Sequence, residues 1–183
     1  MKTLFLDRDG VINDRLPGAY VRSWEEFAFL PGVLSAIALL RQYYDRIVIV
    51  TNQQGIGKKL MTEDDLHRVH QAMLAAIEKA GGRIDAVYFC PDLRSKPQNC
   101  RKPAPAMALQ AQNDAPEIDF TRSTMVGDSA SDMAFGRQLG MATVLIETNG
   151  DEIIKLAKHP EWVDQRYPSL WAFAKNVERR PGH

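Results

Sequence analysis

Two carboxylates follow a short apolar run near the start of the chain, where Leu4–Leu6 is followed by Asp7 and Asp9. An apolar run of this kind is typical of a buried parallel strand, which carries its functional groups at its C-terminal end. Residues two positions apart share a face of an extended chain, so the two acids repel unless a cation lies between them or one holds a proton. Mg²⁺ prefers such oxygen ligands and leaves room for a phosphate oxygen. The spacing is therefore compatible with a metal-dependent phosphate site, and equally with a surface turn that carries two solvated acids.

Further polar groups follow three other predicted strands. They are Thr51, Asn52 and Gln53 after the strand at 47–50, Arg101 and Lys102 in the loop after 86–89, and Asp128 and Asp132 after 124–126. Because parallel strands bring their C-terminal ends to one edge of a sheet, we expect these groups to converge there with Asp7 and Asp9. The convergence points to phosphoryl transfer, which needs a nucleophile, a metal, an oxyanion clamp and a proton donor.

Each group then has an expected role. Asp7 would be the nucleophile that forms an aspartyl phosphate, and Asp9 would protonate the leaving alkoxide and later deprotonate the hydrolytic water. The metal ligands would be Asp7, Asp128 and the backbone carbonyl of Asp9, with Asp132 orienting the site from behind them. The phosphate and the rest of the substrate would be bound by Thr51, Asn52, Gln53, Arg101 and Lys102.

The elements that must position these groups alternate along the chain. A fifth strand is predicted at 143–146, and helices are predicted after Pro31-Gly32, after Thr62, near 107–112, after Gly127, near 152–158 and near 169–177. Residues 11–29 are expected to form a long loop over the active edge, and 51–57 a polar loop that contains glycine. We therefore expect an α/β fold with a parallel sheet, in one domain over residues 1–183.

Composition excludes several classes of protein. The 183 residues are 45% hydrophobic and contain 23 basic and 23 acidic residues, so no net field recruits nucleic acid or an anionic membrane. Cys90 and Cys100 are too few for a disulfide framework, and His67 and His70 on a predicted helix are expected to be surface groups. No signal peptide or long apolar run is visible, so the expected location is the cytoplasm.

The motifs resemble those of a known family. Asp7-Arg8-Asp9-Gly10, Thr51-Asn52, Lys102 and Gly127-Asp128 with Asp132 are similar to the four motifs of the haloacid dehalogenase (HAD) superfamily of phosphohydrolases, over residues 2–150. The longer strings at 7–13, 51–55 and 100–103 resemble the capless branch, subfamily III, which contains heptose bisphosphate and histidinol-phosphate phosphatases. The resemblance implies a Rossmann-like three-layer α/β/α sandwich with a central, mainly parallel sheet and no large cap domain, dependence on Mg²⁺, and a small phosphorylated substrate.

The chain departs from that branch in two places. The branch has a zinc loop with the pattern Cys-x-His and Cys-x-Cys, whereas this chain has Cys90-Pro91-Asp92 and Gln98-Asn99-Cys100. Two of the four ligands are replaced, so zinc binding is not expected. Ser129 stands where the branch has Lys or Arg, so one cationic contact to substrate is missing.

The expected activity is Mg²⁺-dependent hydrolysis of a small sugar phosphate, with the 7-phosphate of a heptose 1,7-bisphosphate as the first expected substrate. Histidinol phosphate is the alternative substrate. A phosphoryl-accepting or binding protein that does not hydrolyse phosphate is an alternative of another class, disfavoured because Asp9 supplies the acid/base that hydrolysis needs. A polynucleotide phosphatase is disfavoured by the zero net charge. The sequence leaves the oligomeric state open, and a monomer is compatible with it.

Overall fold

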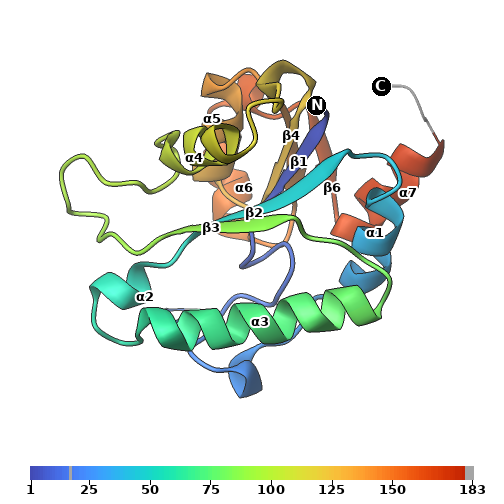
Figure 1. Ribbon diagram of the computed structural model, residues 1–183. Coiled ribbons are helices and arrows are strands. Elements are labelled where there is room, and N and C mark those ends of the chain that lie inside the picture. The colour runs from blue at the N-terminus through green and yellow to red at the C-terminus, as the bar shows by residue number, and fades with distance from the viewer. Residues whose placement is uncertain (17, 180–183) are drawn as a thin grey trace.

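A six-stranded parallel sheet forms the centre of the protein (Figure 1). The computed structural model describes residues 1–16 and 18–179, so residue 17 of the expected loop at 11–29 and the last four residues lie outside it. The strands are β1 (Thr3–Leu6), β2 (Arg46–Asn52), β3 (Ala86–Cys90), β4 (Thr124–Gly127), β5 (Ala142–Ile146) and β6 (Gln165–Tyr167). Their order, β3-β2-β1-β4-β5-β6, places the topological switch point between β1 and β4, where sheets of this kind bind ligands.

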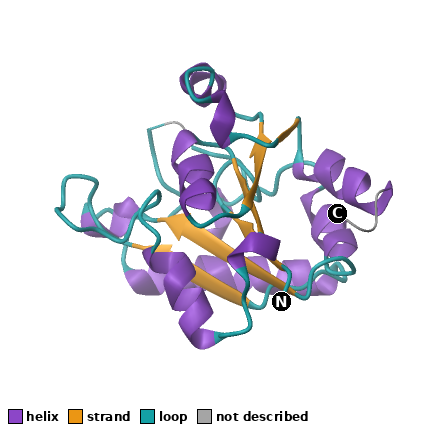
Figure 2. Ribbon diagram, turned by 90° about the horizontal axis from the view of Figure 1, so that it is seen from above, coloured by secondary structure: helices purple, strands orange, loops and turns teal. Residues whose placement is uncertain are grey.

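Helices cover both faces of this sheet (Figures 1 and 2). They are α1 (Val33–Leu40), α2 (Gln54–Gly57), α3 (Glu63–Lys79), α4 (Ala106–Asp114), α5 (Ala130–Gln138), α6 (Gly150–Leu156) and α7 (Leu170–Arg179). Alternate residues of β1 face opposite ways, as a pleated strand requires. Leu4 and Leu6 join a core with residues of α1, α3 and α7, whereas Phe5 joins a second core with residues of α4 and α5. The expected three-layer α/β/α sandwich is confirmed.

Local patterns account for most of these elements, and two differ from expectation. All five predicted strands are present, but β6 was not predicted, because its three residues are polar or aromatic and none is buried. The segment expected to be a loop at 51–57 instead continues β2 to Asn52 and then forms the single turn α2. Both predicted helices of the tail are present as α6 and α7. No helix in the described part of the chain has the length and apolar character needed to cross a membrane.

The long helix α3 corrects one prediction. It begins with a capping box in which Thr62 and Asp65 satisfy each other's backbone N–H groups. His67 is exposed as expected, but His70 is buried, so its assignment to the surface was wrong. Residue 70 lies four positions after 66 and three before 73, which places it on the apolar stripe that faces the sheet.

Candidate active site at the C-terminal ends of the strands

Three carboxylates meet at the switch point of the sheet. Asp7 follows β1, Asp128 follows β4, and Asp132 lies in the first turn of α5; each offers a ligand atom within 4.8 Å of the others, and all three are buried. Two glycines allow this approach. A Cβ on Gly10, whose φ is +94°, would lie 2.1 Å from Asp128 Oδ2, and a Cβ on Gly127 would lie 2.2 Å from Asp132 Cβ. Larger residues at these two positions would therefore push the acids apart.

Lys102 is the buried counter-ion of this cluster. Its Nζ lies 2.8 Å from Asp7 Oδ1 and 2.6 Å from Asp132 Oδ1, and it donates a hydrogen bond of 2.7 Å to the carbonyl of Val50. Asn52 fixes the backbone of Lys102, because its Oδ1 accepts from the Lys102 N–H at 2.9 Å. Burial opposes the charge on Lys102, but Asp132 and Asp7 raise its pKa, so the ammonium stays charged.

The remaining negative charge fits a divalent cation. Burial, followed by repulsion from the neighbouring carboxylates, raises the pKa of Asp128 to about 8, and burial likewise raises that of Asp7 to about 6. Asp128 Oδ1 accepts from Arg15 Nη2 at 2.7 Å, but Asp128 Oδ2 is buried with no hydrogen-bond partner among the described residues. A carboxylate oxygen in that position is costly unless a cation meets it. Oxygen donors of this kind suit Mg²⁺, so the residues present fit that ion.

Asp9 occupies a separate corner of the site, where three side chains hold it. Its Oδ1 accepts from Arg8 Nη2 at 2.9 Å and from Asn13 Nδ2 at 3.0 Å, and its Oδ2 accepts from Gln53 Nε2 at 2.9 Å. The amide of Gln53 also donates to Thr51 Oγ1 at 2.9 Å. Burial favours the neutral acid, but the charge of Arg8 and the three donors outweigh it and lower the pKa of Asp9. Asp9 is therefore ionised in the free protein.

A pocket of ≈ 650 Å³ opens beside these groups. All five predicted binding residues line it, and so do Asp7, Asp9 and Asp132. Besides the buried Arg8 and Lys102, the basic residues that line the pocket are Arg15, Arg94, Arg101 and Lys155. A pocket with carboxylates at its base and several cations around them is suited to an anionic ligand whose reacting end meets the acids.

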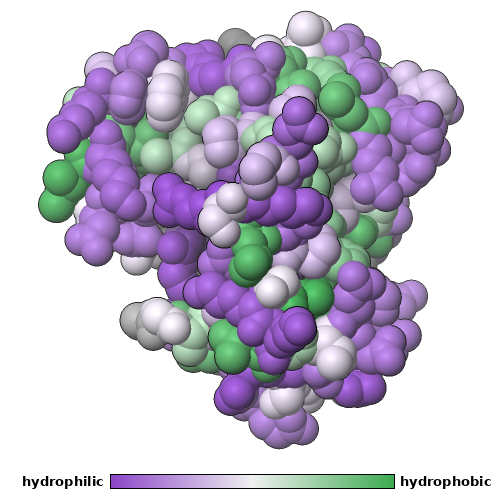
Figure 3. All heavy atoms as spheres, turned by 90° about the vertical axis from the view of Figure 1, so that its left-hand side faces the viewer, coloured by the Kyte–Doolittle hydropathy of each residue, from purple (hydrophilic) through white to green (hydrophobic). Residues whose placement is uncertain are grey.

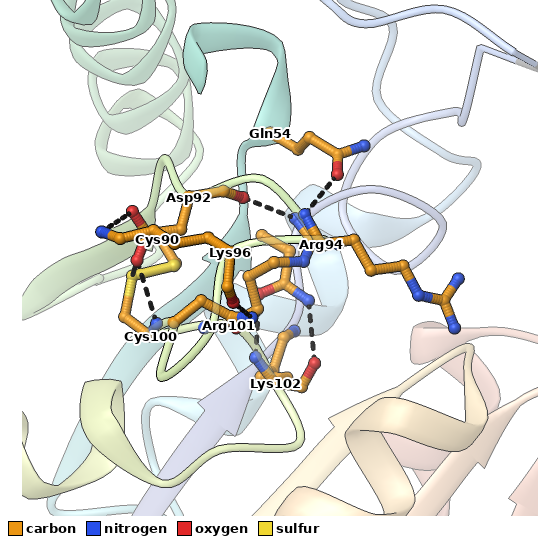
Figure 4. The surroundings of a disulfide bond; sticks show 10 residues. Gln54, Cys90, Asp92, Arg94, Lys96, Cys100, Arg101 and Lys102 are labelled. Carbon is orange, nitrogen blue, oxygen red and sulfur yellow. Dashed lines mark hydrogen bonds and ion pairs between the residues drawn. A yellow bond between two sulfur atoms is a disulfide. The ribbon is translucent and has the colours of Figure 1, made fainter. Parts of the chain in front are cut away.

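One wall of the pocket belongs to the loop 91–101, which a disulfide closes (Figure 4). Cys90 at the end of β3 is bonded to Cys100, an arrangement that the sequence did not predict. Asp92 accepts from Lys96 Nζ at 2.6 Å and from the Cys100 N–H at 3.2 Å. While the disulfide is intact neither sulfur is a thiolate, so the two cysteines cannot act as the thiolate ligands of a zinc ion. The loop projects on the left of Figure 1, and the face seen from that side is mostly hydrophilic (Figure 3).

Sequence reasoning missed three residues of the site. Arg8 lies between the two acids of the first motif, and its guanidinium is almost fully buried. For His70 a sequence signal did exist, because its spacing places it among the apolar residues of α3 that face the sheet. Arg15, which meets Asp128 and donates a long hydrogen bond of 3.5 Å to the Asp9 carbonyl, gave no signal because it lies in a loop without periodicity.

Comparisons with known proteins agree with this geometry. A HAD-hydrolase-like family model matches residues 99–172. The D-glycero-alpha-D-manno-heptose-1,7-bisphosphate 7-phosphatase of Mycobacterium tuberculosis is 37% identical over 182 residues, which cover 98% of this chain and 93% of that protein. A crystal structure of the D,D-heptose 1,7-bisphosphate phosphatase of Bordetella bronchiseptica, complexed with magnesium and phosphate, has a TM-score of 0.87 at 34% identity and covers 98% of this chain and 99% of that one.

A second solved structure, the D,D-heptose 1,7-bisphosphate phosphatase of Burkholderia thailandensis, has a TM-score of 0.70 at 34% identity and covers 98% of this chain and 100% of that one. Identity above 30% over nearly the whole length of these relatives shows that the similarity is not confined to the four short motifs. The chain therefore belongs to the heptose-1,7-bisphosphate 7-phosphatase family of HAD-like hydrolases.

Proposed function

We propose that this protein is a Mg²⁺-dependent phosphomonoesterase that removes the 7-phosphate from D-glycero-D-manno-heptose 1,7-bisphosphate. The observation that carries the proposal is the convergence of Asp7, Asp9 and Lys102 at the switch point, in a chain whose relatives are named for this activity. The relatives act on alpha or beta anomers according to their names, and we propose the activity for the heptose bisphosphate without assigning the anomer.

The residues account for a reaction in two steps. A carboxylate oxygen of Asp7 attacks phosphorus, the bond from phosphorus to the sugar oxygen breaks, and Asp9 gives that oxygen a proton. Asp9 then takes a proton from water, whose oxygen attacks the aspartyl phosphate and releases Asp7 and inorganic phosphate. Since Asp9 is ionised in the free protein, it must take up its proton as the anionic substrate binds, because nearby negative charge raises the pKa of a carboxyl group.

Asp7, Asp128 and the carbonyl of Asp9 would hold the metal, and Asp132 holds Lys102 beside Asp7. Bound Mg²⁺ supplies positive charge that offsets the repulsion between the phosphate and Asp7. Lys102 and the hydroxyl of Thr51 are placed to bind phosphoryl oxygens, since both line the base of the pocket.

The rest of the substrate would meet the wall of the pocket. A second phosphate suits the basic side chains Arg94 and Arg101 on the 91–101 loop. Arg15 and Lys155 line the pocket together with Ser129, so they supply the positive charge that the serine lacks. Arg101 is half-buried, and burial, followed by the charge of Arg94, lowers its pKa. A bound anion would offset the repulsion between these two cations.

We also propose that the protein acts in the cytoplasm on this small metabolite, and that residues 1–183 form one domain. A sugar with two phosphates carries charges that oppose its passage through a bilayer, so its hydrolase is expected in the compartment where it is made.

Phosphate release tests the function. The purified protein is assayed with and without Mg²⁺ on the heptose bisphosphate, histidinol phosphate and several common sugar phosphates, with Asp7→Asn as the control for contaminating phosphatases. A preference for the heptose 7-phosphate that requires Mg²⁺ supports the proposal. Preferred turnover of histidinol phosphate or another ester would overturn the substrate, and no turnover of any ester would overturn the activity.

A further inference from the structure

Arg8 is a buried cation with a limited set of partners. Its side chain is 1% exposed, Nη2 donates to Asp9 Oδ1 at 2.9 Å, and Nε has no hydrogen-bond partner among the described residues. Its other terminal nitrogen, Nη1, lies 3.1 Å from Nε2 of His70, which comes from α3, 62 residues later in the chain. The buried guanidinium is therefore fixed between one carboxylate and one imidazole.

The contact defines the state of the imidazole. A guanidinium only donates hydrogen bonds, so Nε2 of His70 must accept, and the ring proton of the neutral imidazole must lie on Nδ1. Burial, followed by the charge of Arg8, lowers the pKa of His70 to about 3, which keeps the ring neutral. His70 is thus an acceptor built into the apolar face of a helix, where every other buried residue is apolar.

We propose that His70 is a positioning residue for the proton transfers of Asp9, because its Nε2 holds Arg8 in the rotamer that keeps the Asp9 carboxylate in place. The proposal rests on the acid/base role of Asp9 proposed above. Asp9 shares Arg8 with His70, so the imidazole acts on the reaction through the guanidinium and touches neither substrate nor metal ligand itself.

The hydrogen bonds of Arg8 favour this role over simple packing. An apolar residue at position 70 would fill the space against Phe89, whose ring centroid lies 6.4 Å from that of His70. It would leave Nη1 of Arg8 buried without an acceptor, which is costly, so Arg8 would turn toward solvent or toward another acceptor. The Asp9 carboxylate would keep its bonds from Asn13 and Gln53 but lose the only charged donor that it has among the described residues. Its carboxyl would then sample orientations that miss the leaving oxygen.

The dependence on the leaving group tests this role. General acid catalysis matters for a sugar alkoxide, a strong base, and much less for p-nitrophenolate, a weak one. We compare kcat/KM for the heptose bisphosphate and for p-nitrophenyl phosphate in His70→Leu, which removes the acceptor, and His70→Gln, which keeps an acceptor oxygen. The control is His67→Leu, on the exposed side of the same helix, where the ring also meets Phe89 but not Arg8.

We expect His70→Leu to lower kcat/KM by about 10- to 100-fold for the sugar phosphate and by less than about threefold for the aryl phosphate, since a general acid contributes about 10²–10⁴ in rate. His70→Gln should recover most of the loss, and His67→Leu should change neither value. An equal loss on both substrates, or no loss, would overturn the proposal. If Asp9→Asn itself shows no dependence on the leaving group, the acid role of Asp9 fails first and the role of His70 falls with it.

A spectroscopic measurement reads the state of the imidazole in the unsubstituted protein directly. With ¹⁵N-labelled histidine, the resonances lost in His70→Leu identify His70. We expect a neutral ring with its proton on Nδ1 throughout pH 5–8, the less common tautomer of free histidine. A ring that carries its proton on Nε2 would show that Arg8 is not its donor and would overturn the proposal.

Discussion

The cluster around Lys102 and the loop 91–101 line the same pocket, but different forces hold them. Lys102 pairs with Asp132 where both side chains are 1% exposed, whereas the loop's own pair, Lys96 with Asp92, has side chains 56% and 18% exposed. The buried pair is barely screened and each member depends on the other; the exposed pair is screened by water and adds little. A covalent bond, Cys90–Cys100, fastens the loop instead.

The residues expected to react and the residues expected to select the substrate lie in these two different regions. The groups that would react lie at the ends of β1 and β4, where strand hydrogen bonds such as Asp7 N–H to Val126 O at 2.9 Å fix the backbone. The groups that would select the substrate, Arg94 and Arg101, lie on the loop outside the strands. Changes in the first region should act on turnover and folding, and changes in the second on KM.

The largest expected effect comes from Asp7→Asn. The amide cannot attack phosphorus, so phosphate release should fall by at least about a thousandfold. The fold should survive, because the substitution removes one of several mutually repelling buried acids and leaves Lys102 its contact with Asp132. Phosphate release and the unfolding temperature are measured together, and turnover within tenfold of the parent protein would remove Asp7 from the nucleophile role.

Lys102→Met compared with Lys96→Met tests the two ion pairs directly. Losing Lys102 leaves buried carboxylates without their cation and should lower the free energy of unfolding by about 3–5 kcal/mol. Losing Lys96 should lower it by less than about 1 kcal/mol, because that pair is exposed. Urea denaturation measures both, and similar losses in the two variants would show that burial does not make the Lys102 pairs stronger than the Lys96 pair.

Reduction of the disulfide should loosen only the loop. In the chain-entropy model, a disulfide that closes a loop of this length raises the free energy of the unfolded chain by about 3 kcal/mol, because it removes conformational entropy from that chain. Reduction should therefore lower the free energy of unfolding by up to that amount. KM for the substrate should rise more than kcat falls, because Arg101 follows Cys100 directly. The control is the double variant Cys90→Ala, Cys100→Ala, which should not respond to reductant.

Equal KM values for the oxidised and reduced protein would show that the disulfide does not shape the substrate wall. The redox state of Cys90 and Cys100 in cells also bears on the location of the protein, since thiols in the cytoplasm are kept reduced. Mass spectrometry of protein alkylated in intact cells reports which form is present there.

A further expected effect is a pH dependence of the acid cluster. The folded protein binds the protons of Asp7 and Asp128 more tightly than the unfolded chain does, since their pKa values are raised from 3.8 to about 6 and about 8. Without metal, these two groups therefore make stability fall as pH rises from about 4 to about 8. Mg²⁺ competes with the same protons, so its stabilising effect should grow across that range. Unfolding temperatures with and without Mg²⁺ measure this, and a Mg²⁺ effect that does not change with pH would argue against Asp128 as a ligand.

The sequence by itself determined the frame of this protein. Short runs of three or four mostly apolar residues and helical stripes are local signals, so they located five strands and the main helices. The polar residues that end those strands could be assigned to one edge because parallel strands share a direction. The α/β fold and the phosphatase family are confirmed, while the individual roles of Asp7, Asp9 and Asp128 stay predictions.

Only the tertiary structure decided which side chains meet. Arg15 contacts Asp128, which lies 113 residues later in the chain, and Arg8 contacts His70, which lies 62 residues later. Cys90 forms a disulfide with Cys100 across a loop in which two of the four zinc ligands expected from the family resemblance are replaced. His70 shows the limit most clearly: its spacing indicated burial, but an imidazole without a visible partner favours the surface. A polar group can be buried only when another element supplies its hydrogen bond, and that partner is set by the packing of distant segments, which no local pattern encodes.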